Sequence, residues 1–332
     1  MRDPAIATGD ARLFGDERAF GSDTGVVGDQ GAPTNIRPAA SRRIVAIVNP
    51  ATHGDAAAIV DLLRRHAPAD ADLDVRLTQA AGTTTALTHE ALADGARAVV
   101  AVGGDGTVAA VATALRGTGI PLGVIPGGST NVTARSLDIP AHPSEAVALL
   151  FGPHRHVPLD IGLCGETCFL HMAGAGLDSR MFAESNPALK RRIGWLAYLP
   201  PAIHDLSLPL ARFTIVTDGV ATEVTSPLVL IANGSSIISP RLSLYPGIRT
   251  DDSWLDVLIF TPTSPLEIAR TLVQLARHGL AHSRYLTHIR ARHIEITADP
   301  ALPVELDGDV VASTPLTVQL APAALNVIVP TW

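Results

Sequence analysis

A chain of 332 residues is long enough for two domains, each with a core of its own. Apolar residues make up 47% of the chain and charged residues 17%, a globular composition that excludes disorder over most of the length. The formal charge of −7 argues against a general nucleic-acid-binding protein, because neutralising phosphates needs a basic surface, and we expect no nucleic-acid partner.

The cysteines and the apolar runs bear on where the protein works. Cys164 and Cys168 are too few for a disulfide framework or a four-sulfur zinc site, and we expect both to be reduced. No apolar stretch approaches the roughly 18 residues of a membrane-spanning helix. The acidic N-terminal residues are unlike a secretory signal. We therefore expect a cytoplasmic protein that at most touches a membrane peripherally.

Residues 1–41 show neither helical nor strand periodicity and are rich in Gly, Asp, Ala and Pro, which predicts a disordered tail. From residue 42, short continuous apolar runs alternate with segments of helical spacing, a pattern typical of a parallel sheet buried on both faces. The pattern predicts an α/β nucleotide-binding domain over 42–152. Its expected strands are at 42–50, 73–78, 97–102 and 120–128, and its helices at 55–66, 84–94, 107–115 and from 129 onward.

Beyond residue 153 the pattern changes to short strand-like segments separated by turn residues. Such segments are at 210–219, 226–234, 253–260, 292–298, 303–309 and 316–321. They predict a second domain over 153–332 that is β-rich, antiparallel and sandwich-like, and whose last strands can pack back on the first domain.

The stretch "VVAVGGDGTVAAVATAL", residues 99–115, runs from a strand through a glycine corner into a helix. The backbone N–H groups of residues 104–107 then face outward at a helix N-terminus, which favours an anion such as phosphate. Asp105 would repel a bare phosphate but attract Mg²⁺ bound to one. Two other interpretations stay open: a G-x-G-x-x-A dinucleotide corner, although it follows the third strand, and a purely structural tight turn.

A second corner repeats the arrangement one βα unit later, in "PLGVIPGGSTNVTARSL", residues 121–137. A third element, "NPATHG" at 49–54, follows the first strand. Carboxyl ends of neighbouring parallel strands meet at one edge of the sheet, so the corners are expected side by side, where they can hold a triphosphate.

These motifs, together with "ELDGD" at 305–309, occur in the order and spacing that resemble the diacylglycerol kinase catalytic-domain family. That family includes bacterial soluble lipid kinases and the sphingosine and ceramide kinases, and the "PGGSTN" form is similar to its actinobacterial branch. The resemblance spans about residues 43–330. "GGDGT" alone is shared with NAD kinases and phosphofructokinases.

The resemblance implies an ATP- and Mg²⁺-dependent kinase that phosphorylates a lipid hydroxyl, diacylglycerol-like or sphingoid-like, with the second domain holding the lipid. The nucleotide would be bound by Asn49, Pro50, Gly54, Thr78, Gly103, Gly104, Asp105, Gly106, Thr107, Gly128, Ser129 and Asn131. Ala109 and Ala110 stand where the family often has Asn and Glu, and "ATH" separates Pro50 from Gly54 where two residues are usual.

The carboxylates carry the remaining implied roles. The catalytic set would be Asp309, Asp105 and Asp307, with Asp309 in the position of the family's proposed base, a glutamate. A structural Mg²⁺ would be bound by Asp252 with the backbone oxygens of Arg249 and Trp254, although Ser253 replaces the usual glycine. Asp160 matches an acid near the active site.

A lipid acceptor implies a membrane contact. "LKRRIGWLAYLPP" at 189–201 places basic residues beside aromatic ones, as interfacial segments do, and 266–284 is amphipathic. A homodimer is left open as a further partner. Two alternative functions are kept: an NAD-kinase-like kinase of a soluble acceptor, and a catalytically silent lipid- or nucleotide-binding protein, suggested by Asp309 and the two alanines.

Overall fold

The computed structural model describes residues 42–52, 56–79, 82–176, 210–234, 245–262 and 283–331, with scattered positions between 264 and 274. The predicted tail at 1–41, the interfacial segment at 189–201 and most of the amphipathic segment at 266–284 lie outside the described residues. Within the described part of the chain, no helix is long and apolar enough to cross a membrane.

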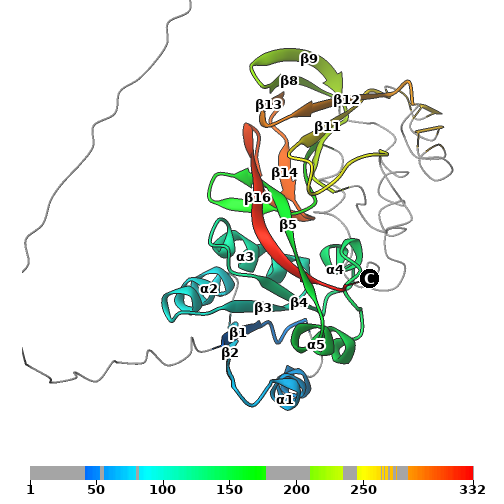
Figure 1. The fold of residues 1–332 in the computed structure, drawn as a ribbon. Coiled ribbons are helices and arrows are strands. Elements are labelled where there is room, and N and C mark those ends of the chain that lie inside the picture. Colours follow the sequence, from blue (N-terminus) through cyan, green and yellow to red (C-terminus); the bar gives the residue numbers. More distant parts are fainter. Residues whose placement is uncertain are drawn as a thin grey trace, which may run out of the picture. The chain divides into compact units, whose positions relative to one another are not determined.

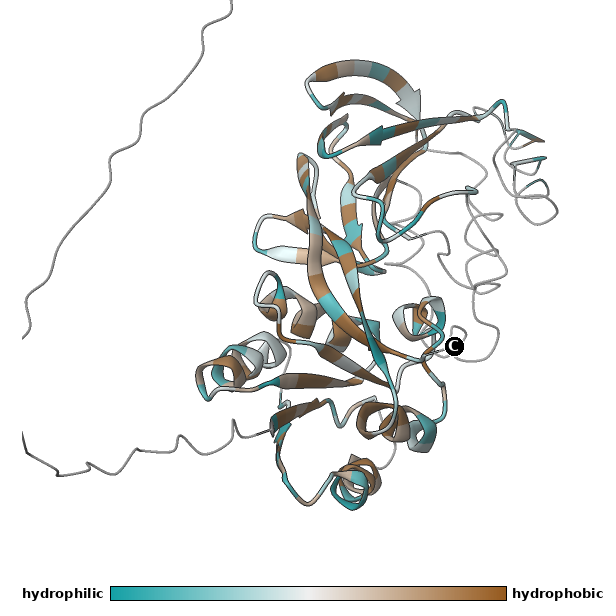
Figure 2. Cartoon of the chain, viewed as in Figure 1, coloured by the Kyte–Doolittle hydropathy of each residue, from teal (hydrophilic) through white to brown (hydrophobic). Residues whose placement is uncertain are grey.

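The N-terminal part is built on four parallel strands in the order β2-β1-β3-β4 (Figure 1). These strands are β1 Arg42–Val48, β2 Ala71–Leu77, β3 Ala98–Gly103 and β4 Leu122–Pro126. Every residue of β4, and all but the first of β3, is buried, which explains why both read as continuous apolar runs. Figure 2 shows β3 almost wholly in the apolar colour.

Helices α1 and α5 pack beside each other, as do α2 and α3, with the strands between the two pairs (Figure 1). Their bounds are α1 Ala56–His66, α2 Thr83–Ala93, α3 Asp105–Leu115 and α5 Pro143–Phe151. The helix predicted from residue 129 begins later and is short, as α4 Val132–Ser136. The predicted α/β architecture with a parallel sheet is confirmed.

The last strand connects the two halves of the described structure. Strand β16, Leu316–Val329, pairs in parallel with β4 and antiparallel with β5 (Arg155–Cys164) and β13 (His293–Asp299). One ten-stranded sheet therefore includes strands from both sides of the predicted domain boundary at residue 152. It extends to β8 Ala211–Thr217 and β9 Val220–Ser226, and β6 Thr167–Phe169 pairs with β5. Val327 of β16 is buried in the core of the α/β part and Val318 in the core of the β-rich part.

A second, six-stranded sheet is antiparallel throughout, in the order β12-β11-β10-β7-β14-β15. Its strands are β7 Met172–Gly176, β10 Leu228–Ala232, β11 Leu255–Phe260, β12 Leu286–Ala291, β14 Pro303–Leu306 and β15 Asp309–Ser313. Side chains of both sheets share one core, with Phe169 and Phe213 among the largest fully buried ones. This is the predicted sandwich-like β domain, although β5 to β7, β9, β12 and β15 are not among the predicted strands.

Candidate active site

The two glycine corners touch each other at the ends of β3 and β4. The N–H of Gly127 donates to the carbonyl of Gly103 at 2.8 Å. A Cβ added to Gly128 would lie 2.7 Å from the Cα of Gly104, and one added to Gly103 would lie 2.4 Å from Oγ1 of Thr107. Glycine is therefore required at these positions by packing within the protein, before any ligand is considered. The corners lie side by side, as the sequence predicts.

Asp105 joins the two corners. It is the first residue of α3, and its carboxylate accepts a hydrogen bond from the hydroxyl of Thr130 at 2.9 Å and one from the N–H of Thr133 at 3.2 Å. The second bond satisfies a free N–H in the first turn of α4. A carboxylate has about four acceptor positions, so these two bonds leave others for a cation. Asp105 is only half-buried.

The second corner is held by its own asparagine. Asn131 has a φ of 47°, and its side chain accepts from the N–H of Gly128 and donates to the carbonyl of Gly128, both at 2.8 Å. Asn131 therefore shapes the loop, while the neighbouring Ser129 is exposed. Of these two predicted nucleotide contacts, Ser129 has the more accessible side chain.

The first loop is tied to the first corner. Nδ2 of Asn49 donates to Oγ1 of Thr107 at 3.2 Å, and the N–H of Ala51 donates to Oδ1 of Asn49 at 3.0 Å. Pro50 is exposed beside them, and Thr78 is buried, with its N–H bonded to the carbonyl of Val48 at 2.9 Å. Gly54 lies outside the described residues.

Asp309 reaches the first corner from the far end of the sequence. It begins β15 after a tight hairpin turn in which Asp307 and Gly308 have φ of 48° and 94°, the left-handed values that an Asp-Gly hairpin turn adopts. A Cβ added to Gly106 would lie 3.2 Å from Oδ2 of Asp309, and apart from its chain neighbours and the backbone of its own helix no other described atom would lie within 4 Å. Gly106 and Asp309 are both exposed, so this carboxylate lies next to the open side of α3's first turn.

Asp307 is engaged differently, although the resemblance groups it with Asp309. Its carboxylate accepts hydrogen bonds from the N–H groups of Leu170, His171 and Met172 at 2.7, 2.9 and 3.0 Å. The residue keeps some exposed surface, but its carboxyl group is densely surrounded, and this burial raises the pKa of Asp307 against the opposing effects of His171 and the three N–H groups. Asp307 therefore fixes the segment before β7, and of the two acids in this turn it is Asp309 whose carboxylate lies at the first glycine corner.

Sequence reasoning missed His171. Its ring is buried, with 6% of its surface exposed, and Nε2 lies 3.0 Å from Oγ1 of Thr133 in α4. The only local signal is a histidine inside the apolar run "FLHMAGAG", which by itself does not distinguish a structural residue from a functional one.

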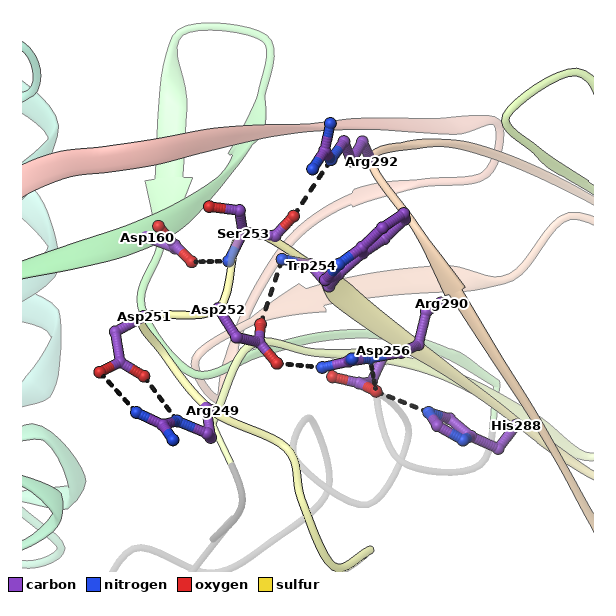
Figure 3. Close-up of polar contacts among 10 residues, drawn as sticks. All are labelled: Asp160, Arg249, Asp251, Asp252, Ser253, Trp254, Asp256, His288, Arg290 and Arg292. Atoms are coloured by element: carbon purple, nitrogen blue, oxygen red, sulfur yellow. Dashed lines mark hydrogen bonds and ion pairs between the residues drawn. The ribbon is translucent and has the colours of Figure 1, made fainter.

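The predicted structural Mg²⁺ site lies in a loop before β11 that is held by charges of the protein (Figure 3). Asp252 forms an ion pair with Arg290 of β12 and accepts from the N–H of Trp254 at 3.2 Å. The side chain of Arg249 pairs with Asp251, which lowers the pKa of that carboxyl. The magnesium site stays a prediction, and the ion would compete with Arg290 for Asp252.

Two buried acids complete this loop. Asp160 accepts from the N–H of Ser253 at 2.6 Å (Figure 3). It also accepts from the N–H of Ala323 at 2.8 Å, so it joins the loop to the bulge in β16. Asp256 contacts His288 at 2.6 Å and Arg290 at 3.3 Å. No group of three or more His, Cys, Asp or Glu side chains suited to a metal occurs among the described residues.

Both cysteines are free, as the sequence predicts. Burial raises the pKa of Cys168 to about 11, so its thiol stays protonated near neutral pH. Cys168 packs against Thr113 of α3, and its N–H donates to Oγ1 of that residue at 3.3 Å. Cys168 therefore has a structural role, in the packing of β6 against α3.

Comparisons with known proteins agree with this architecture. The family model of the diacylglycerol kinase catalytic domain matches residues 43–164, and the model described as the YegS C-terminal NAD kinase beta sandwich-like domain matches residues 171–329. A crystal structure of a diacylglycerol kinase from Bacillus anthracis str. Sterne superposes with a TM-score of 0.71 at 24% identity, over 87% of this chain and 98% of that one. This likeness supports the fold.

Curated relatives are more similar in sequence. A protein of Pseudomonas fluorescens named "Probable lipid kinase YegS-like" is 34% identical over 262 residues, which is 78% of this chain and 86% of the relative. The protein of the same name from Pseudomonas syringae pv. syringae is 34% identical over 270 residues, covering 78% and 84%. An uncharacterized protein of Synechocystis, sll0036, is 27% identical over 302 residues, covering 86% and 69%. The glycine corners, the sandwich and these relatives together show that the chain belongs to the YegS-like lipid kinase family with a diacylglycerol kinase catalytic domain.

Proposed function

We propose that this protein uses ATP to phosphorylate the hydroxyl group of a diacylglycerol-like or sphingoid-like lipid. The observation that carries the proposal is the position of Asp309, whose carboxylate lies against Gly106 in the first glycine corner. A carboxylate at this place would lie close to a phosphate bound at the corner and could contact the hydroxyl that attacks it.

The nucleotide phosphates would lie across the two corners. Phosphoryl transfer depends on positioning and charge neutralisation more than on covalent chemistry. The backbone at the start of α3 supplies partial positive charge, and Ser129 offers an exposed hydroxyl at the second corner. Mg²⁺ bound with the nucleotide would neutralise phosphate charge, and Asp105 is the residue best placed to hold it.

Asp309 would act as the general base. The lipid oxygen attacks the γ-phosphorus, the bond from that phosphorus to the β,γ-bridging oxygen breaks, ADP leaves, and the hydroxyl proton passes to the Asp309 carboxylate. Asp307 cannot readily serve instead, because its carboxylate already accepts three backbone N–H groups.

Two exposed valines support an apolar acceptor. Val310 and Val311 follow Asp309 directly and are 45% and 50% exposed. Apolar surface next to the proposed base suits an acyl or sphingoid chain better than a small polar acceptor. A lipid acceptor also implies peripheral attachment of a cytoplasmic enzyme to a membrane, which we include in the proposal.

One observation favours a second candidate. The C-terminal family model is described as NAD kinase beta sandwich-like, so a soluble acceptor such as NAD has to be tested. The test is incubation with labelled ATP and either a lipid extract in mixed micelles or NAD. Label in a lipid supports the proposal, label only in NAD supports the second candidate, and nucleotide binding without transfer in either supports a silent binding protein.

A further inference from the structure

A series of hydrogen bonds connects the turn that precedes Asp309 with Asp105 in the first glycine corner. The Asp307 carboxylate, two residues before Asp309, accepts the N–H of His171 at 2.9 Å. Nε2 of His171 lies 3.0 Å from Oγ1 of Thr133, and the N–H of Thr133 donates to Oδ1 of Asp105 at 3.2 Å. His171 thus joins these two sets of contacts, through its N–H on one side and its ring on the other.

The ring of His171 has little freedom to leave this position. The N–H groups of Asn233 and Gly234 both donate to its carbonyl, at 2.7 and 3.1 Å. A Cβ added to Gly234 would lie 2.9 Å from Nδ1, so glycine there leaves room for the ring. Asn233 is fully buried and anchors the same segment through Leu170, whose carbonyl accepts from Nδ2 at 2.8 Å.

The second ring nitrogen suggests what the histidine is for. Nδ1 is buried and has no hydrogen-bond partner among the described residues. A buried polar atom without a partner costs stability, on the order of 1–3 kcal/mol. An apolar residue of similar size would avoid that cost, but it would also lose the contact between Nε2 and Thr133.

From these contacts we propose that His171 is a positioning residue that sets the separation of Asp105 and Asp309. This role rests on the proposed function, because it concerns the distance between the first glycine corner and Asp309, the proposed base. His171 does not contact the reacting atoms. It holds the segment before β7, and with it the Asp307 turn, at a fixed distance from α4 and the Asp105 carboxylate.

The decisive variants remove the bond between His171 and Thr133 from either side. Thr133→Val keeps the shape and the N–H that Asp105 uses but loses the hydroxyl. His171→Leu keeps most of the volume, and His171→Gln retains a polar atom that reaches Thr133. We expect Thr133→Val and His171→Leu each to lower kcat on the order of tenfold with little change in the KM for ATP, because displacement of a base by a fraction of an ångström slows transfer.

Their combination and their controls separate positioning from general damage. The double variant should be no slower than the worse single variant, since both remove one bond. His171→Gln should recover most of the lost kcat. Thr88→Val removes another buried threonine hydroxyl, which bonds within its own helix α2 at 2.8 Å, and should leave kcat unchanged. Additive losses, or a parental kcat in folded Thr133→Val, would overturn the inference.

Amide hydrogen exchange tests the same connection without any turnover. Thr133→Val should speed exchange both at 104–107 and at 170–172, segments joined through this bond, and Thr88→Val should not. An increase confined to α4, or one spread evenly over the protein, would contradict the inference. If the parent protein phosphorylates no lipid, the proposed function fails, and this measurement still decides whether His171 connects the two segments.

Discussion

The glycine corners and the loop at 249–254 resemble each other as sequences, since both place an aspartate among small or polar residues, but their structures differ. At the corners, Asp105 accepts from a hydroxyl and a backbone N–H and pairs with no arginine or lysine in the described part of the chain, and Gly106 beside it is exposed. In the loop, Asp252 already faces the guanidinium of Arg290. The corners therefore keep room for a cation and an anion, whereas the loop contains a cation of the protein itself.

This difference shows which structural features can be predicted from a short sequence motif. A glycine corner is built by the backbone of consecutive residues, so its spacing is visible in the sequence. The partner of Asp252 comes from a strand 38 residues away. Removing groups from each region in turn tests whether the corners are catalytic and whether the loop is structural.

The largest effect is expected at Asp309. Asp309→Asn should lower lipid phosphorylation by about a hundredfold to ten-thousandfold, the range for loss of a general base, and should spare nucleotide binding. Asp309→Glu should also be slower, because Oδ2 already lies close to Gly106 and a longer stem would crowd α3. Turnover and nucleotide affinity are measured on both variants.

Asp61→Asn is the matched control for Asp309→Asn, because it removes an exposed carboxylate on α1 whose ion pair among the described residues is with Arg65 of the same helix. Its rate should equal that of the parent. Equal rates for Asp309→Asn and the parent would remove Asp309 as the base, and a faster Asp309→Glu would mean that the shorter side chain holds the base back.

Asp105 comes next. Asp105→Ala should lower Mg²⁺-dependent turnover at least about a hundredfold, the scale of losing one electrostatic stabiliser. Asp105→Asn separates two roles, because the amide oxygen can still accept from Thr133 while the charge is gone. If Asp105→Asn turns over like the parent, the residue only caps α4, and the catalytic assignment is wrong.

Two alanine substitutions distinguish the glycines by what a Cβ would meet. At Gly106 it meets only Asp309, so Gly106→Ala should lower kcat on the order of tenfold while stability stays the same or rises, since alanine favours helix. At Gly128 it meets the backbone of Gly104, so Gly128→Ala should cost about 1–3 kcal/mol of unfolding free energy. Paired denaturation and turnover measurements check both, and a Gly106→Ala protein with parental kcat would separate Asp309 from the corner.

The sequence predicts the parallel sheet and the corners well for a physical reason. Strands buried on both faces, such as β3 and β4, need apolar residues at nearly every position, and the glycines follow from close backbone contacts. The end of the last strand is predicted less well. The predicted strand ends at residue 321, before Pro322, but β16 continues to Val329 through a bulge at which Ala323 has a φ of 47°.

The site is predictable only in part. The resemblance identifies Asp309, but no spacing in the sequence shows that it lies against Gly106, about two hundred residues earlier. His171 gives only the weak signal of a histidine in an apolar run, because its role depends on contacts with Thr133 and Asp307, which lie in two other segments of the chain. Arg290 is missed likewise, since an arginine alternating with apolar residues in a strand is expected to face solvent.

The smallest effect is expected in the charged loop, and it is a change in stability. Arg290→Met takes the guanidinium from Asp252 and from the buried Asp256, and since Arg290 is 40% exposed we expect a loss of only about 1–2 kcal/mol, below that of a fully buried pair. For a protein of this size that lowers Tm by a few degrees, roughly 2–4 °C per kcal/mol.

In chelator the parent should keep its Tm, whereas millimolar Mg²⁺ should restore part of the Tm of Arg290→Met, because the ion can then bind between the two carboxylates. Adding Asp252→Asn to Arg290→Met should abolish that recovery. Arg249→Met removes the pair with Asp251 and should leave the Tm as it is in the parent. A parent whose Tm rises in Mg²⁺, and loses the rise in Asp252→Asn, would instead support the magnesium site predicted from the sequence and make Arg290 its neighbour.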